Sequence, residues 1–152
     1  MKFQVNDTFL KELPADRIQE NTRRQVSEAC YSFVSPTKTE TPEIVHTSPE
    51  VAELLGISEE DVLSEAFLKV FTGNKLIENT TPYAMCYGGH QFGHWAGQLG
   101  DGRAINLGEI THNEQQWAIQ LKGSGATPYS RTADGLAVLR SSVREYLCSE
   151  AM

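Results

Sequence analysis

Polar and apolar residues alternate strictly over residues 116–122, just before the glycine-rich segment that begins at Gly123. Successive side chains of a strand point to opposite faces, so this stretch predicts a strand with one apolar and one polar face. The apolar face carries Trp117, Ile119 and Leu121, and the other face carries Ala118, Gln120 and Lys122. A turn at 111–114 and an earlier strand at 104–107 complete a predicted hairpin.

Apolar residues change to helical spacing near the C-terminus. Leu136, Leu139, Val143 and Leu147 fall on one side of a helix predicted over 136–152, because a helix advances about 100° per residue. Glu145 lies nearly opposite, on a side whose other members are small or uncharged: Val138, Ser141, Ser142, Cys148 and Ser149. This pattern suggests a helix that packs on both sides. The helix has no Gly, Pro or Asn to end it, so we expect the natural chain to continue beyond Met152.

The pattern of the first half of the chain predicts short helices and few residues suited to catalysis or ligand binding. One helix begins at Ser48, where Pro49 and Glu50 follow a capping serine, and it ends at Gly56. A second is capped by Ser58 and has a continuous apolar stripe, formed by Val62, Leu63, Ala66, Phe67 and Val70. A short strand is expected at 43–46 within an exposed connector. These features suggest an N-terminal extension at 1–81 and a second unit at 82–152.

Composition narrows the class of protein. The chain has 152 residues, 39% hydrophobic and 22% charged, which is typical of a globular domain. Its net charge of −7 argues against a nucleic-acid partner. Three widely spaced cysteines indicate a reducing compartment rather than a disulfide framework. Without a targeting signal or an apolar run long enough to span a membrane, we expect a cytoplasmic protein with no membrane contact.

Glycines cluster in a bend at 97–103, where Gly100, Asp101, Gly102 and Arg103 follow one another. Glycine lets backbone N–H groups approach an anion closely, and the arginine adds the charge that phosphate oxygens require. The bend matches neither the P-loop pattern nor the dinucleotide pattern, and Gly-Asp-Gly also suits an ordinary tight hairpin. Both interpretations stay open from the bend alone.

Lys122 and Glu145 extend the phosphate interpretation. A lysine on the strand after a glycine bend can reach phosphates beneath that bend, although it can equally be a solvated cation at a strand end. Glu145 can pair with this ammonium, or it can be an exposed acid at the edge of its helix. The order of glycine bend, strand lysine and helix glutamate resembles the nucleotide clamp in the upper lobe of a protein kinase.

Cys86, His90 and His94 are spaced as metal ligands would be on a helix. Three glycines lie between them, at 88, 89 and 93, and they disfavour a helix here. We therefore expect a strand and a turn with structural side chains, and no metal site in this chain.

Four segments resemble the signature of the selenoprotein O family: 87–95 (YGGHQFGHW), 98–104 (QLGDGRA), 120–131 (QLKGSGATPYSR) and 134–147, with Asp-Gly at its start and LRSSVREYL at its end. The resemblance implies an α+β fold: a protein-kinase-like N-lobe, with an antiparallel sheet and one flanking αC-type helix, preceded by a helical N-terminal segment. The kinase-like domain would be incomplete here.

The resemblance also implies a function. The family's members are protein adenylyltransferases, which move AMP from ATP to Ser, Thr or Tyr hydroxyls of protein substrates and hold ATP flipped relative to kinases. Gly100, Gly102, Arg103, Lys122, Asp134 and Gly135 would then bind ATP, and Glu145 would pair with Lys122. The magnesium ligands and the catalytic base would lie beyond Met152, so no catalytic residue is expected in this chain and it should be inactive alone.

Two alternatives remain at this stage. The chain could belong to a non-catalytic, pseudokinase-type scaffold that binds nucleotide without transferring any group. It could also belong to a plain protein kinase, although the usual glycine-loop pattern of kinases is absent.

Overall fold

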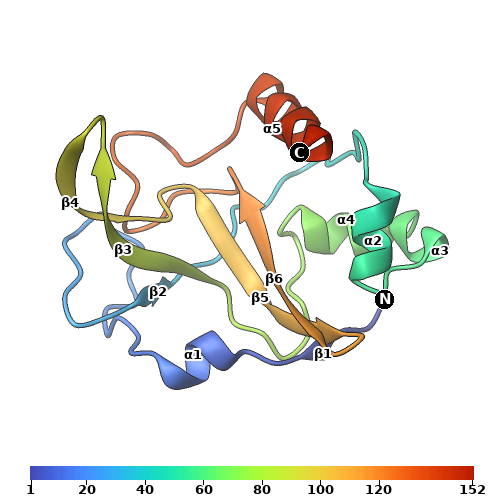
Figure 1. The fold of residues 1–152 in the computed structure, drawn as a ribbon, viewed down its shortest axis with the longest axis horizontal. Coiled ribbons are helices and arrows are strands. Elements are labelled where there is room, and N and C mark those ends of the chain that lie inside the picture. Colours follow the sequence, from blue (N-terminus) through green and yellow to red (C-terminus); the bar gives the residue numbers. More distant parts are fainter.

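Two antiparallel hairpins from the second half of the chain form most of the sheet (Figure 1). The computed structural model describes residues 1–152. The four strands are β3 (Tyr83–Gln91), β4 (His94–Gly100), β5 (Ala104–His112) and β6 (Gln115–Lys122). The hairpin predicted around residues 111–114 is therefore confirmed, although its first strand is longer than the 104–107 expected.

The first half of the chain adds two short strands to this sheet. β1 (Gln4–Val5) pairs with β5, and β2 (Tyr31–Phe33) pairs with β3, so the sheet has six strands and every pair of strands is antiparallel. The predicted α+β class with an antiparallel sheet is thus confirmed. The likeness to a kinase N-lobe and the division at residues 81 and 82 stay predictions.

A bulge in β5 keeps the apolar side chains of the central hairpin on one face. Ile105 lies opposite Leu121, but the register shifts by one residue before Gly108, which lies opposite Ile119. Gly108 has φ +143°, and a Cβ there would lie 2.6 Å from a methyl carbon of Thr80. The register leaves Lys122 on the opposite face, where the alternation of residues 116–122 predicted it.

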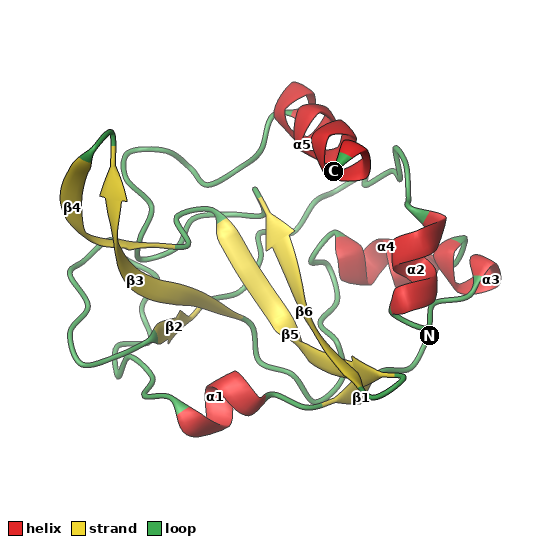
Figure 2. Cartoon of the chain, in the orientation of Figure 1, coloured by secondary structure: helices red, strands yellow, loops and turns green.

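The helices are short and lie outside the sheet (Figure 2). They are α1 (Thr8–Glu12), α2 (Pro49–Leu54), α3 (Glu59–Val62), α4 (Glu65–Phe71) and α5 (Leu139–Ala151). The predicted stripe from Ser58 was wrong in one respect, because Ser64 accepts a hydrogen bond from the Phe67 N–H and starts a new helix. Leu63 therefore lies at the break, with 86% of its surface exposed.

The strand predicted at 43–46 was also wrong, because this segment has no regular structure. No neighbouring strand pairs with it, and a lone extended segment leaves its backbone groups to water. Val45 is accordingly 71% exposed.

The core lies between the sheet and α4. Its main cluster contains Val70, Ile77, Leu107, Ile110 and Ile119. A second cluster, formed by Val34, Ala84 and Ile105, continues toward β2. Both halves of the sequence therefore contribute to one apolar interior.

Helix α5 differs from the other elements because none of its residues is buried. Its apolar side, which includes Leu139, Val143 and Leu147, is exposed, whereas the sequence suggested a helix that packs on both sides. Val45 and His46 lie beside that side without burying it, and they share a shallow groove with Leu139, Val143 and Leu147. None of the helices has the length and hydropathy that a membrane span requires.

Replacing Leu107 by alanine should destabilise the chain by about 2–5 kcal/mol, because Leu107 is 1% exposed and the substitution leaves a cavity. The matched substitution Leu63→Ala, at a position that is 86% exposed, should change the free energy of unfolding by less than about 0.5 kcal/mol. Urea denaturation of both variants measures the difference. Equal effects would contradict the core described here.

Candidate functional site

Three charged side chains from different elements meet at the end of β6. Glu145 of α5 receives Lys122 Nζ at 2.9 Å on one carboxylate oxygen and Arg103 Nη2 at 3.2 Å on the other. A small cavity of about 170 Å³ lies among these residues, with Ala137, Ser141 and Ser142 completing its wall. Two cations on one carboxylate leave a net positive charge beside this cavity.

The two cations change the pKa of the Glu145 carboxylate. The hydrogen bond from Lys122, followed by the charges of Lys122 and Arg103, holds the pKa of Glu145 below its ordinary value of 4.5. All three side chains are 39–54% exposed, so water screens the pairs and they remain open to a ligand.

The glycine bend runs from the end of β4 into β5 and is held by a turn at residues 127–130. The Thr127 hydroxyl donates to the Asp101 carbonyl at 2.7 Å, and the Ser130 hydroxyl donates to the Gly102 carbonyl. Gly100 is required by close packing, because a Cβ there would lie 2.5 Å from the ring of Tyr129 and 2.8 Å from the Met85 carbonyl oxygen. The bend is therefore fixed from two sides.

Asp101 points into the protein and not toward a ligand. Its carboxylate accepts hydrogen bonds from the Met85 N–H at 3.0 Å and from Asn106 Nδ2 at 3.2 Å. Burial raises its pKa even though these bonds oppose the change. Asp101 thus links β3, the bend and β5 in a structural role.

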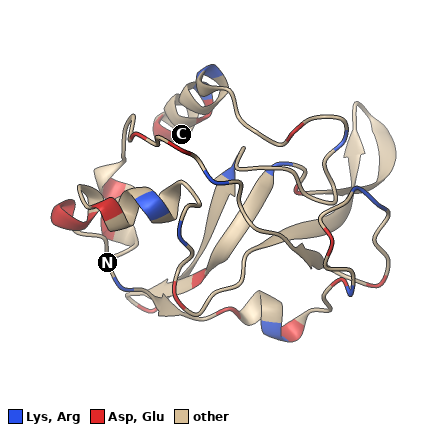
Figure 3. Ribbon diagram, turned by 180° about the vertical axis from the view of Figure 1, so that it is seen from behind, with Lys and Arg blue, Asp and Glu red and all other residues tan.

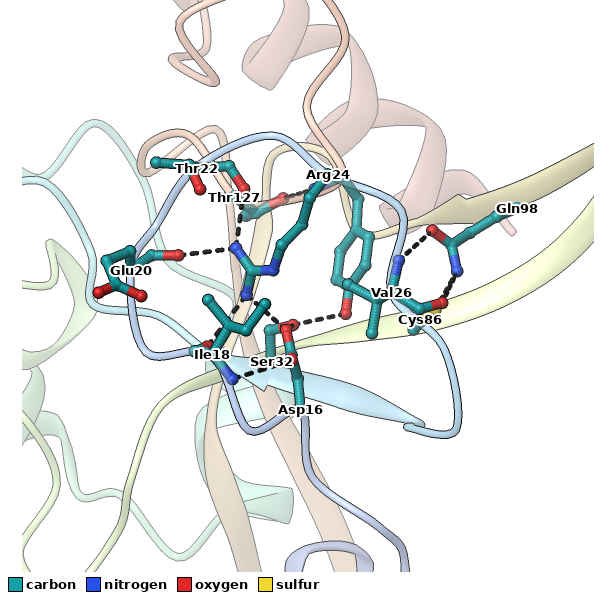
Figure 4. A network of polar contacts seen from close by, with 11 residues as sticks. Asp16, Ile18, Glu20, Thr22, Arg24, Val26, Ser32, Cys86, Gln98 and Thr127 are labelled. Carbon is teal, nitrogen blue, oxygen red and sulfur yellow. Dashed lines mark hydrogen bonds and ion pairs between the residues drawn. The ribbon is translucent and has the colours of Figure 1, made fainter.

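A buried chain of hydroxyl groups supports Tyr129. Ser32, which is fully buried, donates to Asp16 Oδ2 at 2.7 Å, so the Tyr129 hydroxyl donates to Ser32 at 2.8 Å. Burial raises the pKa of Tyr129 to about 12. Arg24 completes the network: its guanidinium binds Asp16 and the carbonyls of Ile18, Glu20 and Thr22 (Figure 4). Both terminal nitrogens of Arg24 are thus occupied within the protein, whereas its Nε is buried without a hydrogen-bond partner.

A large cleft of about 790 Å³ lies beside the glycine bend. Gly100, Gly102 and Tyr129 form part of its wall. Four arginines line it, Arg23, Arg24, Arg103 and Arg131, and no Asp or Glu does. This is unusual in a chain with 20 acidic and 13 basic residues, whose acids are conspicuous on the short helices α2, α3 and α4 (Figure 3). The cleft is suited to an anion.

The structure distributes the predicted site residues over these two spaces. Gly100, Gly102 and Gly135 line the large cleft, Lys122 and Glu145 line the small cavity, and Arg103 lines both. Asp134 lines neither. Its carboxylate accepts the Leu136 N–H at 2.9 Å and shapes the turn that leads to α5. The bend, the lysine and the glutamate are therefore brought together, and Asp134 is beside them.

Sequence reasoning missed Arg23, Tyr129 and Arg131 as wall residues of the cleft. Tyr129 and Arg131 lie in a segment that the family resemblance includes, but no spacing rule gave them a role. No local pattern pointed to Arg23, because its segment is brought to the cleft by long-range contacts. The Arg24 N–H donates to the Pro128 carbonyl at 3.4 Å, and the Val26 N–H donates to Gln98 Oε1 at 2.9 Å.

Cys86 and His90 lie on β3, and His94 begins β4 across the hairpin turn. The expected strand and turn are confirmed. His90 packs edge-on against Trp95, with ring centres 5.1 Å apart. The structure contains no group of three or more His, Cys, Asp or Glu side chains placed to hold a metal ion.

The pKa of Glu145 provides a test of the ion pairs. A lowered pKa in the folded state means that the pairs contribute stability at neutral pH, and that this contribution is lost as the pH falls through the folded-state pKa. Lys122→Met should raise the pKa of Glu145 toward 4.5, as followed by carboxyl NMR titration. An unchanged pKa would show that the pair does not form in solution.

Gly100→Ala should destabilise the chain by about 1–3 kcal/mol more than Gly97→Ala, because only residue 100 is packed against Tyr129 and Met85. Both glycines have positive φ, and a Cβ at Gly97 would meet no atom within 4 Å, so Gly97 controls for the backbone effect. Denaturant unfolding of the two variants provides the comparison. A smaller loss at residue 100 would show that the bend is not packed against Tyr129.

Two comparisons with known proteins point to the same family. A profile of the family described as protein adenylyltransferase SelO matches residues 17–152. Proteins named protein nucleotidyltransferase YdiU are 60% identical in Flavobacterium johnsoniae, 59% in Rhodopirellula baltica and 57% in Methylobacillus flagellatus, each over 148 residues and 97% of this chain. The chain spans 27–29% of the length of these relatives. The chain belongs to the SelO family of protein nucleotidyltransferases.

Proposed function

We propose that this chain is the nucleotide-holding part of a protein adenylyltransferase that uses ATP to modify Ser, Thr or Tyr hydroxyls of other proteins. The observation that carries the proposal is the cleft with four arginines and no carboxylate, joined through Arg103 to the Lys122–Glu145 pair. Its volume of about 790 Å³ is within the usual range for a small-molecule site, roughly 300–1,000 Å³. The names of the relatives give the same class of reaction.

In this proposal the side chains have different roles in binding ATP. Lys122 and Arg103 bind phosphate oxygens, and Glu145 keeps both cations in place between turnovers. Gly100 and Gly102 allow the backbone to approach the phosphates, in the way that the glycine loop of a kinase covers the phosphates of ATP. Gly135 completes the wall of the large cleft, and Asp134 holds the adjoining turn.

The reaction would join the hydroxyl oxygen of the protein substrate to the α-phosphorus of ATP. The bond from that phosphorus to its bridging oxygen breaks, pyrophosphate leaves, and the hydroxyl proton is released. A magnesium ion would stabilise the charge on the leaving phosphates. In this proposal the metal ligands and the base lie in other parts of the full-length protein, as the family resemblance implies, and this chain alone should not catalyse transfer.

Three cysteines without disulfides suit a cytoplasmic location.

The full-length protein should incorporate label into protein from ATP labelled at the α-phosphate, and not from ATP labelled at the γ-phosphate. Lys122→Met should reduce this incorporation by about a hundredfold, because it removes a phosphate ligand without changing the side-chain volume much. Lys69→Met is the matched control, since Lys69 forms a surface pair with Glu65 at 2.7 Å and lines neither the large cleft nor the small cavity.

Two results would contradict this function. Incorporation of the γ-label would identify a protein kinase. ATP binding by the full-length protein without any incorporation would identify a scaffold that binds nucleotide.

A further inference from the structure

The hairpin of β3 and β4 and the loop after β6 are tied together at the large cleft. Arg131, in the loop between β6 and α5, donates a hydrogen bond through Nη2 to Gln91 Oε1 at the end of β3. Both residues line the cleft. The bond uses one nitrogen of the guanidinium and holds the group at the wall of the cleft, with its other donors available.

Arg23 and Arg24 have different roles although they are adjacent. Arg24 has both terminal nitrogens bound by carbonyls and by Asp16, so it is part of the framework (Figure 4). That framework holds the segment against the loop, where the Arg24 N–H meets the Pro128 carbonyl. Arg23 lines the cleft, is exposed, and makes no hydrogen bond or ion pair. Arg24 therefore fixes the backbone from which Arg23 projects.

The sizes of the two spaces limit how a nucleotide can lie. The small cavity beside Lys122 has a volume of about 170 Å³, below the usual range of roughly 300–1,000 Å³ for small-molecule sites. It can take a phosphate group but not a whole nucleotide. Any nucleotide that reaches Lys122 must therefore lie mostly in the large cleft, past Arg103. Of the four arginines that line this cleft, only Arg23 and Arg131 have no carboxylate partner.

We propose that Arg23 and Arg131 form a second phosphate-binding subsite, separate from the one at Lys122 and Arg103. The two subsites together would hold a chain of phosphates at more than one point, so that the cleft prefers nucleoside triphosphates and pyrophosphate to a monophosphate. Gln91 is a positioning residue in this subsite, because it orients Arg131. The inference rests on the proposed function and adds to it the residues that select for the length of the phosphate chain.

The test compares ATP, AMP and inorganic pyrophosphate as probes, by calorimetry on the full-length protein. Arg131→Gln and Arg23→Gln should each weaken the binding of ATP and pyrophosphate by about tenfold, the usual effect of losing a charge-assisted hydrogen bond, and should change AMP binding less than twofold. Arg131→Lys should restore part of the loss because it keeps the charge. Gln91→Ala should show a smaller loss than Arg131→Gln with the same preference among probes.

Arg17→Gln is the matched control. It makes the same change of charge at an exposed arginine that does not line the cleft, and it should leave all three affinities unchanged. The subsite is contradicted by equal losses for all three probes, or by unchanged ATP binding in both cleft variants. Loss of transfer to protein with unchanged nucleotide affinity would assign the arginines to the protein substrate, which also overturns the subsite.

The same experiment separates this inference from the proposed function. If Lys122→Met weakens ATP binding while the Arg23 and Arg131 variants do not, the function stands and the subsite is wrong. If the unmodified protein binds none of the three probes, both are wrong.

Discussion

The Glu145 carboxylate is the interaction on which the arrangement of the site depends. It pairs with two cations. Arg103, the residue just before β5, lies 3.2 Å away through Nη2, and Lys122, the last residue of β6, lies 2.9 Å away through Nζ. Helix α5 has no buried residue, so apolar packing does not fix its position. Within this chain, these ion pairs and the 2.8 Å hydrogen bond between His46 and Tyr146 are the polar contacts that join α5 to the rest of the structure. The pairs therefore connect the position of the helix to the charge state of the cleft.

A rigid framework lies behind this more open set of charges. The Asp16, Ser32 and Tyr129 network is buried and fully hydrogen-bonded, and the Tyr129 ring packs on Gly100. Buried polar networks of this kind specify one arrangement, because each unsatisfied group would be costly. The glycine bend is thus preorganised, and Arg103 and Lys122 stay exposed enough to exchange their partner Glu145 for a ligand. This division suits a site that binds and releases a charged substrate.

Sequence patterns predicted the central hairpin and the final helix because those elements depend on local periodicity. The alternation at 116–122 gave the face of Lys122, and the bulge at Gly108 preserves that face along β5. The two short strands β1 and β2 left no periodic signal, since two or three residues do not define one, and they exist through pairing with distant strands. The break at Leu63 was missed because Ser64 forms a cap that competes with continuation of the helix.

For the site, the glycine bend, Lys122 and Glu145 could be proposed from residue types and order. Arg23 could not, because its place in the cleft results from contacts between residues about a hundred positions apart, such as that of Arg24 with Pro128. The contact of Asp134 with ATP, which the resemblance implied, stays a prediction; in this structure its carboxylate accepts a hydrogen bond from the Leu136 N–H of its own turn.

The most direct measurement of the central claim is a crystal structure of the full-length protein with a non-hydrolysable ATP analogue. The account predicts phosphate oxygens within hydrogen-bonding distance of Lys122 Nζ and the Arg103 guanidinium, with the rest of the nucleotide in the cleft bounded by Gly100 and Tyr129. A nucleotide bound elsewhere, with Lys122 and Glu145 paired and facing solvent, would contradict it.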